Sequence, residues 1–292
     1  MRQWLSPDTE RAAALLEAHP DYRILRSLPP PDLLPLPEPE GRVRTAAIID
    51  TETTSLDPAT GHIIELAICP VSFDARGRIV GIGPMHDWLE DPGYALPPEI
   101  VRLTGLTDAD LAGRRIDDAA ALELLSSTDL IIAHHASFDA AWVERRYPSI
   151  AGKPWVCSLK DIDWRSHGYE GRQLGALLGD VAGFFNTRHR ADADVAALVA
   201  LLTTTLPSGR AACSEMLLSA QHPTVRVMAS GAPFEVKDRL KARHYRWDPK
   251  LRCWWTEVTR AMADDERAWL AREAHCHHPT LREITWHQRH RS

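Results

Sequence analysis

The alternation of hydrophobic and polar positions predicts an α/β core in the middle of the chain. Two short apolar runs, at 45–50 and 129–135, are typical of buried strands. The apolar segments 62–74 and 78–90 flank a polar turn and predict a β-hairpin. Further patterns predict a short strand at 155–158 and helices at 96–107, 117–126, 137–147, 173–180 and 191–205. A hairpin followed by alternating helices and strands predicts an α/β fold whose central mixed sheet is flanked by helices.

The segment before this core has a different pattern. Residues 6–19 predict a short amphipathic helix, with Ser6 as its N-cap and Pro7 at its first position. The proline-rich stretch 29–41 is unsuited to a helix or a central strand and predicts a stiff, extended linker. We therefore expect a peripheral N-terminal arm.

The segment after the core predicts a small α+β domain. Strands are expected at 224–230 and 253–258, and helices at 234–245 and about 260–273, whereas the tail is polar and weakly patterned. The expected organisation has three parts: an arm and linker over 1–41, the core domain over 42–207 and a small basic and aromatic domain over 222–292.

Composition narrows the class of protein only slightly. The hydrophobic content of 44% suffices for a sizeable core, and no apolar run is long enough for a transmembrane helix. The five cysteines form no C-x-x-C pair and the N-terminus lacks an apolar signal core, so we expect a reducing compartment, the cytoplasm. The net charge of −6 does not exclude a nucleic-acid enzyme, because a metal-binding carboxylate cluster is itself acidic.

Asp50 and Glu52 at the end of the first apolar strand are the first candidate site residues. Residues i and i+2 of a strand project to the same face, so both carboxylates point into one space. They repel each other unless a cation lies between them, and hard oxygen ligands suit Mg²⁺ or Mn²⁺. Taken alone, the pair is a weak signal and is more often an ordinary strand end with its turn.

Three more candidates lie at or near the starts of later helices. Asp139 follows the second buried strand, and Asp194 lies five residues after His189. Each carboxylate has a structural explanation too, since the helix dipole favours acidic residues in a first turn. Asp192 competes with Asp194 for any functional role, and a single histidine is more often structural than catalytic. The order and spacing of all five residues together, rather than any one residue, indicate a functional site.

In that order, DTETT (50–54), HHASFD (134–139) and HRADAD (189–194) resemble the three motifs of the DEDDh family of 3′→5′ exonucleases, which includes the epsilon proofreading subunit of bacterial DNA polymerase III. The resemblance spans about residues 44–206. It implies a ribonuclease H-like fold with a five-stranded mixed sheet and two divalent metal ions, Mg²⁺ or Mn²⁺. By motif position, the implied metal ligands are Asp50, Glu52, Asp139 and Asp194. The spacing H-x-A-x-x-D selects Asp194 over Asp192 and makes His189 the implied general base.

The resemblance also implies a substrate pocket. Thr53, Thr54 and Leu56 are expected to line the site of the 3′ nucleotide, with His135 and Phe138 nearby. His135 stands where the family often has Asn, and Ser55 where it often has Gly; neither change removes a ligand or the base. His135 is expected to alter contacts near the substrate, so it bears on substrate preference rather than on activity.

The expected substrate is a single-stranded or frayed DNA 3′ end, cleaved to nucleoside 5′-monophosphates in repair, turnover or proofreading. A DNA polymerase or a repair protein is the expected partner. RNA is the alternative substrate, because the same motifs serve both sugars. A binding scaffold without catalysis is the alternative from another class, although all five motif positions are filled.

The C-terminal domain is expected to be basic and aromatic. Over 234–252, seven Lys and Arg residues outnumber three Asp and Glu residues, and Trp247, Trp254 and Trp255 lie among or beside them. Such interleaving suits single-stranded nucleic acid. A simple tryptophan core and a protein-docking surface are the alternatives. The cluster at 275–278 lacks a second ligand pair at zinc-site spacing.

Overall fold

The computed structural model describes residues 6–186 and 190–291 and divides the chain into two compact units. The first unit takes in the chain up to Ser219 and the last residues from His290, and the second takes in Ala220–Arg289. The domain boundaries expected from the sequence stay predictions. Among the described residues, no helix is both long enough and apolar enough to cross a membrane.

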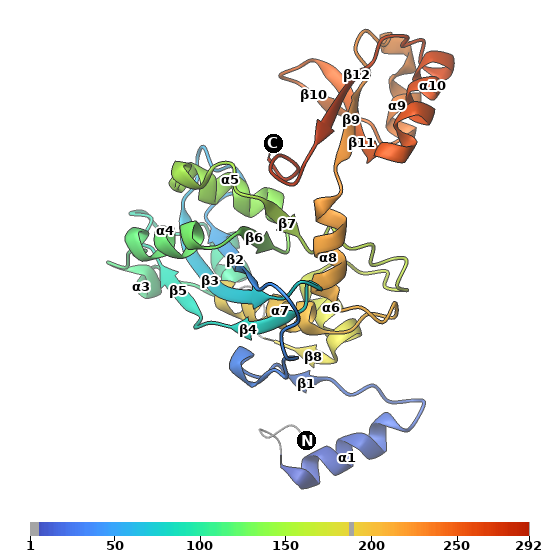
Figure 1. The fold of residues 1–292 in the computed structure, drawn as a ribbon. Helices are drawn as coiled ribbons and strands as arrows, with labels where there is room; N and C mark the ends of the chain where they lie inside the picture. The colour runs from blue at the N-terminus through green and yellow to red at the C-terminus, as the bar shows by residue number, and fades with distance from the viewer. Residues whose placement is uncertain (1–5, 187–189, 292) are drawn as a thin grey trace. The chain divides into compact units, whose positions relative to one another are not determined.

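A six-stranded mixed sheet forms the centre of the first unit (Figure 1). Its strands are β2 (Arg44–Thr53), β3 (Ile63–Phe73), β4 (Ile79–Ile82), β5 (His86–Leu89), β6 (Leu130–Ala133) and β7 (Trp155–Cys157). The order is β4-β3-β2-β6-β7, and β5 also pairs with β3. Strand β2 runs antiparallel to β3 and parallel to β6, and β6 runs parallel to β7. The predicted central mixed sheet is confirmed.

The second half of the predicted hairpin is two strands rather than one. The chain leaves the sheet between Ile82 and His86, where the Gly83 N–H donates to the Pro70 carbonyl at 2.7 Å. Strands β4 and β5 then pair with different stretches of β3. The sheet therefore has six strands in the five positions that we expected.

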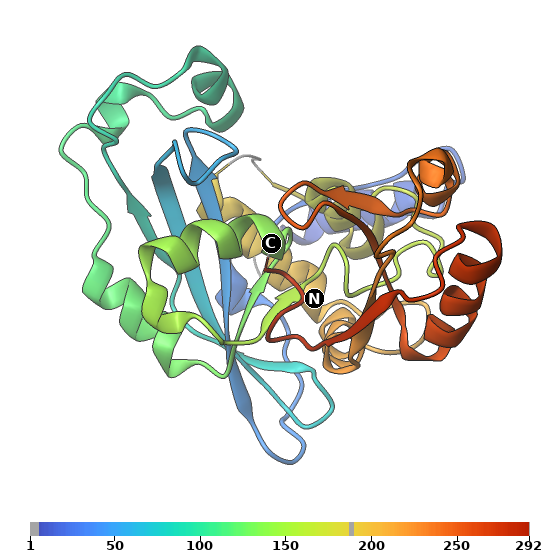
Figure 2. The ribbon, with the colours of Figure 1, turned by 90° about the horizontal axis from the view of Figure 1, so that it is seen from above.

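Helices cover both faces of this sheet. They are α2 (Pro98–Thr104), α3 (Asp108–Leu111), α4 (Asp118–Ser127), α5 (Ala136–Arg146), α6 (Leu174–Leu177), α7 (Ala191–Thr203) and α8 (Ala212–Gln221). Helices α4 and α5 lie on one side of the sheet and α7 on the other (Figures 1 and 2). Because both faces are covered, residues 46–49 of β2 are 0% exposed, and this explains the continuous apolar run in the sequence.

Two helical segments differ from the prediction. The pattern at 173–180 forms only one α-helical turn and continues as the π-helix η3 (Leu178–Ala182), which ends at Gly183 with a φ of 71°. Helix α8 was missed, although its buried residues have helical spacing: Cys213, Met216, Leu217 and Ala220.

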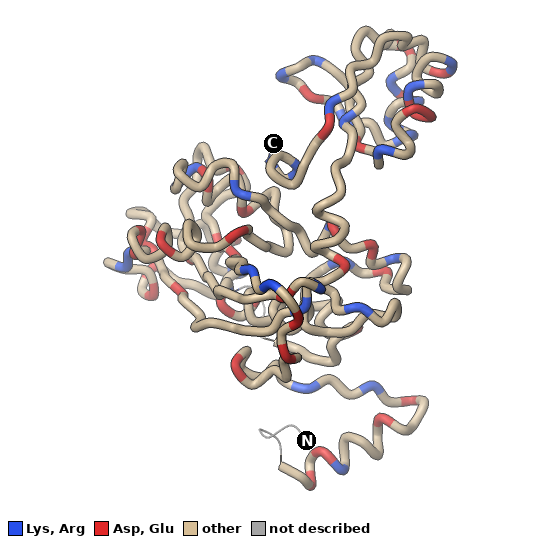
Figure 3. The backbone as a smooth tube through the Cα atoms, viewed as in Figure 1, with Lys and Arg blue, Asp and Glu red and all other residues tan. Residues whose placement is uncertain are grey.

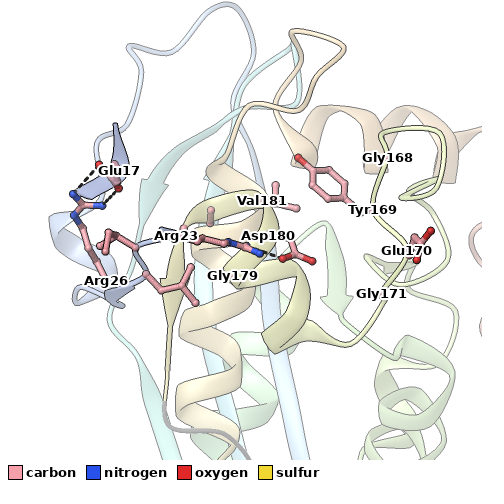
Figure 4. Close-up of a pocket in the computed structure, with 14 residues that line it drawn as sticks. Glu17, Arg23, Arg26, Gly168, Tyr169, Glu170, Gly171, Gly179, Asp180 and Val181 are labelled. Carbon is pink, nitrogen blue, oxygen red and sulfur yellow. Dashed lines mark hydrogen bonds and ion pairs between the residues drawn. The ribbon is translucent and has the colours of Figure 1, made fainter. Parts of the chain in front are cut away.

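A short pair of strands joins the N-terminal arm to the rest of the first unit. Helix α1 (Pro7–Glu17) is capped by Ser6, whose Oγ accepts from the Thr9 N–H at 3.2 Å, and none of its residues is buried. Strand β1 (Arg26–Ser27) pairs in parallel with β8 (Phe184–Phe185). The linker contains one short 3₁₀ helix, η1 (Pro31–Leu33). An open pocket of about 720 Å³ lies between the arm and residues 168–171 and 179–183, where Arg23 pairs with Asp180 at 2.6 Å (Figure 4).

The second unit is a four-stranded antiparallel sheet packed on two helices. Its strands are β9 (Thr224–Met228), β10 (Arg246–Asp248), β11 (Cys253–Thr259) and β12 (Thr280–Ile284), in the order β10-β11-β9-β12. Its helices are α9 (Lys237–Ala242), α10 (Ala263–Glu273) and the short 3₁₀ helices η4 (Phe234–Val236) and η5 (Arg260–Met262). The core includes Val227, Leu240 and Leu270. Strand β12 lies in the weakly patterned tail and was not predicted. Four of its five residues are exposed, so the sequence shows no alternation there.

Candidate active site

Strand β2 carries two carboxylates on one face. Asp50 and Glu52 are half-buried, whereas Thr51 between them is buried and points to the opposite face. Both acidic residues belong to the paired part of the strand, since Asp50 lies opposite Ala67 and Glu52 opposite Glu65 on β3. Their backbone is therefore fixed by the sheet.

Helix α7 brings a third carboxylate to the same place. Arg190 is its N-cap, and Asp194 lies in its first turn. Asp50, Glu52 and Asp194 each offer an oxygen atom, and these oxygens all lie within 4.8 Å of one another. Two elements distant in the sequence thus build one cluster of hard oxygen ligands, which fits a divalent cation such as Mg²⁺ or Mn²⁺.

Asp139 approaches from the other side of the sheet. It lies in the first turn of α5, is only 2% exposed, and accepts a hydrogen bond from Thr51 Oγ1 at 2.9 Å. It is not among the three residues with mutually close oxygens, yet after burial its charge is the largest cause of the raised pKa of Asp50. All four expected metal ligands therefore lie near the end of β2.

The pKa values of these carboxyl groups are raised. Burial and then the charge of Asp194 raise the pKa of Glu52 to about 8. Burial raises the pKa of Asp139 to about 7, and burial together with the neighbouring carboxylates raises that of Asp50 well above its ordinary value. A bound cation would favour the ionised forms, so the donor set and its electrostatics fit a divalent metal site.

A second acidic group lies beside the first and was missed in the sequence. Glu65 is 0% exposed and, with Asp87 and Asp192, forms another set of carboxylates with close oxygens. Here the chain supplies its own cation, because Arg190 Nε donates to Glu65 Oε1 at 2.8 Å. The Ala191 N–H also donates to Glu65 Oε2 at 3.1 Å. The signal available in the sequence was a charged residue inside the apolar run HIIELAI.

The two aspartates on α7 lie in different carboxylate clusters. Asp192 lies with Glu65 and Asp87, whereas Asp194 lies with Asp50 and Glu52. The geometry therefore agrees with the choice of Asp194 from the motif spacing. His189, the expected general base, lies outside the described residues, so its role stays a prediction.

The expected substrate residues fall into two groups. Thr53 and Thr54 are buried, and their hydroxyls are used within the protein: Thr53 Oγ1 donates to the Ser55 carbonyl at 2.7 Å, and Thr54 Oγ1 lies 2.8 Å from the Tyr94 hydroxyl. Leu56, in contrast, is 87% exposed.

His135 and Phe138 form a stacked pair at the start of α5. Their ring centroids are 6.2 Å apart and the planes differ by 9°. Tyr94, which is 45% exposed, bonds both Thr54 and His62 and was not anticipated from the sequence. These side chains give the neighbourhood of β2 an aromatic and apolar border.

Comparison with known proteins agrees with this geometry. The RNase_T family model, described as exonuclease, matches residues 47–202, and the chain belongs to this exonuclease family. The PolC-type DNA polymerase III of Streptococcus pyogenes serotype M1 is 28% identical over 173 residues, 57% of this chain and 11% of that protein. The chain thus spans about a tenth of the length of the curated relatives it matches.

One solved structure supports the fold, and a second is reported as a match only. A structure of exonuclease I matches with a TM-score of 0.50 and 16% identity, covering 82% of this chain and 64% of the other. Exonuclease X in complex with 5′-overhanging duplex DNA is 26% identical over 54% of this chain and 89% of its own, with a TM-score of 0.40. The fold is the ribonuclease H-like exonuclease fold, and the resemblance to the DEDDh-type 3′→5′ exonucleases is confirmed.

The raised pKa values predict a pH-dependent response to metal. Between about pH 4.5 and 8, Glu52 holds a proton in the folded chain that it loses in the unfolded chain, so in EDTA its contribution to stability falls as the pH rises through this window. Mn²⁺ competes with those protons. The increase in thermal midpoint on adding Mn²⁺ should therefore be larger at pH 8 than at pH 6 in a scanning fluorimetry series. An equal increase at both values, or none, would contradict these pKa shifts.

The Glu65–Arg190 pair predicts a coupled loss of stability. Glu65→Gln should lower the free energy of unfolding by about 2 kcal/mol. This is less than the loss expected for a fully buried ion pair, because the Arg190 side chain is 36% exposed and solvent screens its charge. Arg190→Gln should cost a similar amount, and the double variant little more than either single variant. Urea unfolding of the four proteins measures this cycle. Strictly additive losses would show that the two side chains do not depend on each other.

Proposed function

We propose that the chain removes nucleotides one at a time from DNA 3′ ends, using two divalent metal ions held by Asp50, Glu52, Asp139 and Asp194. The observation that carries this proposal is the convergence of carboxylates from β2, α5 and α7 near the end of β2. When bound, two such cations neutralise charge on the phosphate and on its attacking and leaving oxygens.

The chain's own residues would perform the remaining tasks. The sheet and the Thr51–Asp139 hydrogen bond hold the ligands in place before substrate arrives. His189 takes the proton of the attacking water as general base. The water oxygen bonds to the phosphorus and the bond to the 3′ oxygen breaks. The released nucleotide keeps its 5′-phosphate, and the shortened strand ends in a 3′-hydroxyl.

We further propose a pocket for the terminal nucleotide bordered by Leu56 and the His135–Phe138 pair. The exposed Leu56 offers an apolar contact, and the stacked rings offer a flat surface to a base. Thr53 and Thr54 shape the turn through their hydrogen bonds. Tyr94 joins this border through its contact with Thr54.

The proteins that this chain matches favour DNA over RNA as its substrate. Its matches include a PolC-type DNA polymerase III, E. coli exonuclease I crystallised with single-stranded DNA, and exonuclease X with duplex DNA. We propose a role in repair, turnover or proofreading, with a DNA polymerase or a repair protein as partner. All five cysteines are free and buried, which suits a reducing compartment such as the cytoplasm.

We also propose that residues 42–207 form the nuclease domain, with 1–41 as an accessory arm and 222–292 as a separate domain. The central sheet, helices α2 to α7 and the expected ligands fall within 42–207, whereas α8 follows this range. The second unit has its own sheet and its own core.

A matched pair of variants on α7 tests the site. Asp194→Asn should lower the rate by about 10³-fold or more, because it removes a ligand charge, whereas Asp192→Asn should stay within about tenfold of the parent. The assay is a time course on 5′-labelled single-stranded DNA and its RNA counterpart, with Mg²⁺, Mn²⁺ or EDTA. The expected result is a metal-dependent ladder that shortens from the 3′ end, faster on DNA. Equal losses in the two variants would contradict the assignment, and faster cleavage of RNA would favour the alternative substrate.

A pH–rate profile tests His189. His189→Ala should lower turnover by about 10²–10⁴-fold and remove the rise in rate that accompanies deprotonation of a histidine near pH 6.5. Mn²⁺ affinity, measured by calorimetry, should change little because His189 is not an expected ligand. A profile of the same shape in both proteins would exclude His189 as the base.

A further inference from the structure

One face of the second unit exposes aromatic rings and cations side by side. Phe234 is 72% exposed and Trp247 is 49% exposed. Lys237 Nζ lies 4.1 Å from the centroid of the Phe234 ring, and Lys241 Nζ lies 5.9 Å from that of the Trp254 ring. The ring centroids of Trp254 and Trp247 are 5.6 Å apart. We call these five residues the cation–aromatic strip: Phe234, Lys237, Lys241, Trp254 and Trp247.

Helix α9 divides its cations between two tasks. Arg239 and Arg243 pair with Glu273 and Glu266, with closest N–O distances of 3.8 and 2.9 Å. Lys237 and Lys241 are one helical turn apart and lie over rings instead. Among the described residues, the only carboxylate within ion-pair distance of these two lysines is that of Asp238, which lies 4.0 Å from Lys241; both side chains are exposed, so the pair contributes little to stability. The charge of the strip is therefore largely available to a ligand.

The β10–β11 hairpin next to the strip adds three more cations. Arg246, Lys250 and Arg252 are exposed, and within the described part of the chain no carboxylate lies within ion-pair distance of them. Arg246 instead lies 5.1 Å from the Trp255 ring centroid. Lys and Arg gather on this hairpin in Figure 3.

Charge separates this unit from the rest of the chain. Residues 220–289 contain thirteen Lys and Arg against nine Asp and Glu, a balance of +4 in a chain of net charge −6. The remaining residues therefore carry −10 and repel a phosphate backbone. The basic unit is where a nucleic acid can approach favourably.

We infer that the cation–aromatic strip binds single-stranded DNA; this inference rests on the proposed DNA exonuclease function. Cations meet the phosphates, and exposed rings stack on bases. A duplex stacks its bases internally and offers them no faces, so the strip selects the single strand. In the full chain, the strip would hold the strand whose 3′ end is being shortened.

The experiment measures binding without cleavage. Anisotropy of a 3′-labelled oligothymidylate is followed in EDTA with the full-length chain over a salt series. Lys237→Gln with Lys241→Gln should reduce the slope of log K against log salt by about 1.4, since each cation lost contributes about 0.7 for a single strand. The matched control, Arg267→Gln with Arg272→Gln, removes the same charge from α10 and should leave the slope nearly unchanged.

Ring stacking is tested by Trp247→Ala, which should weaken binding about tenfold, with the exposed Met262→Ala as its control. Equal thermal midpoints establish that each variant is folded. Any one of three results would overturn the inference. The salt slope could be the same in the Lys237/Lys241 variant as in the control, Trp247→Ala could leave the affinity unchanged, or oligouridylate or duplex could bind more tightly than oligothymidylate. Cleavage of a thymidine dinucleotide separates the two proposals, because its single internucleotide phosphate and two bases gain little from the cations and rings of the strip. Normal cleavage with unaffected binding in the variants contradicts the strip alone, and failure to cleave contradicts the proposed nuclease function alone.

Discussion

Mutual repulsion among half-buried carboxylates is the constraint on which the rest of the active-site region depends. Oxygens of Asp50, Glu52 and Asp194 lie within 4.8 Å of one another, and two charges at that distance repel by about 3.5 kcal/mol at an effective dielectric constant of about 20. That exceeds the net contribution of an ordinary hydrogen bond to stability. The protein can hold these groups only as partly protonated acids or around cations, and the raised pKa values express the same balance.

The fold resolves this repulsion differently in two adjacent places. At Glu65, Arg190 supplies an internal cation and the first turn of α7 supplies a backbone donor. At Asp50 and Glu52 burial and the neighbouring carboxylates raise the pKa values, although Arg190 lowers that of Glu52, and this clustering fits a metal site. Both clusters include a residue of α7, and strand β2 of the first pairs with strand β3 of the second, so the internal ion pair holds the helix that carries Asp194. A structural salt bridge thereby supports the functional site.

Much of the fold was predictable from the sequence because buried strands and helix starts leave periodic signals. A hairpin followed by alternating helices and strands sufficed to predict a mixed sheet. The choice of Asp194 over Asp192 needed the resemblance to the family motif and stays a prediction. The division of the second hairpin strand into β4 and β5 was not predictable from alternation, nor was edge strand β12, which is mostly exposed. Glu65 and Tyr94 were missed because their importance depends on partners distant in the sequence, Arg190 and Thr54.

The most direct test of the metal site is a crystal structure of the Mn²⁺-soaked protein with anomalous scattering measured at the manganese edge. The account predicts two anomalous peaks among Asp50, Glu52, Asp139 and Asp194, and none between Glu65 and Asp87, where Arg190 already balances the charge. Peaks confined to the Glu65 cluster, or the absence of any peak beside Asp50 in a soaked crystal, would contradict it.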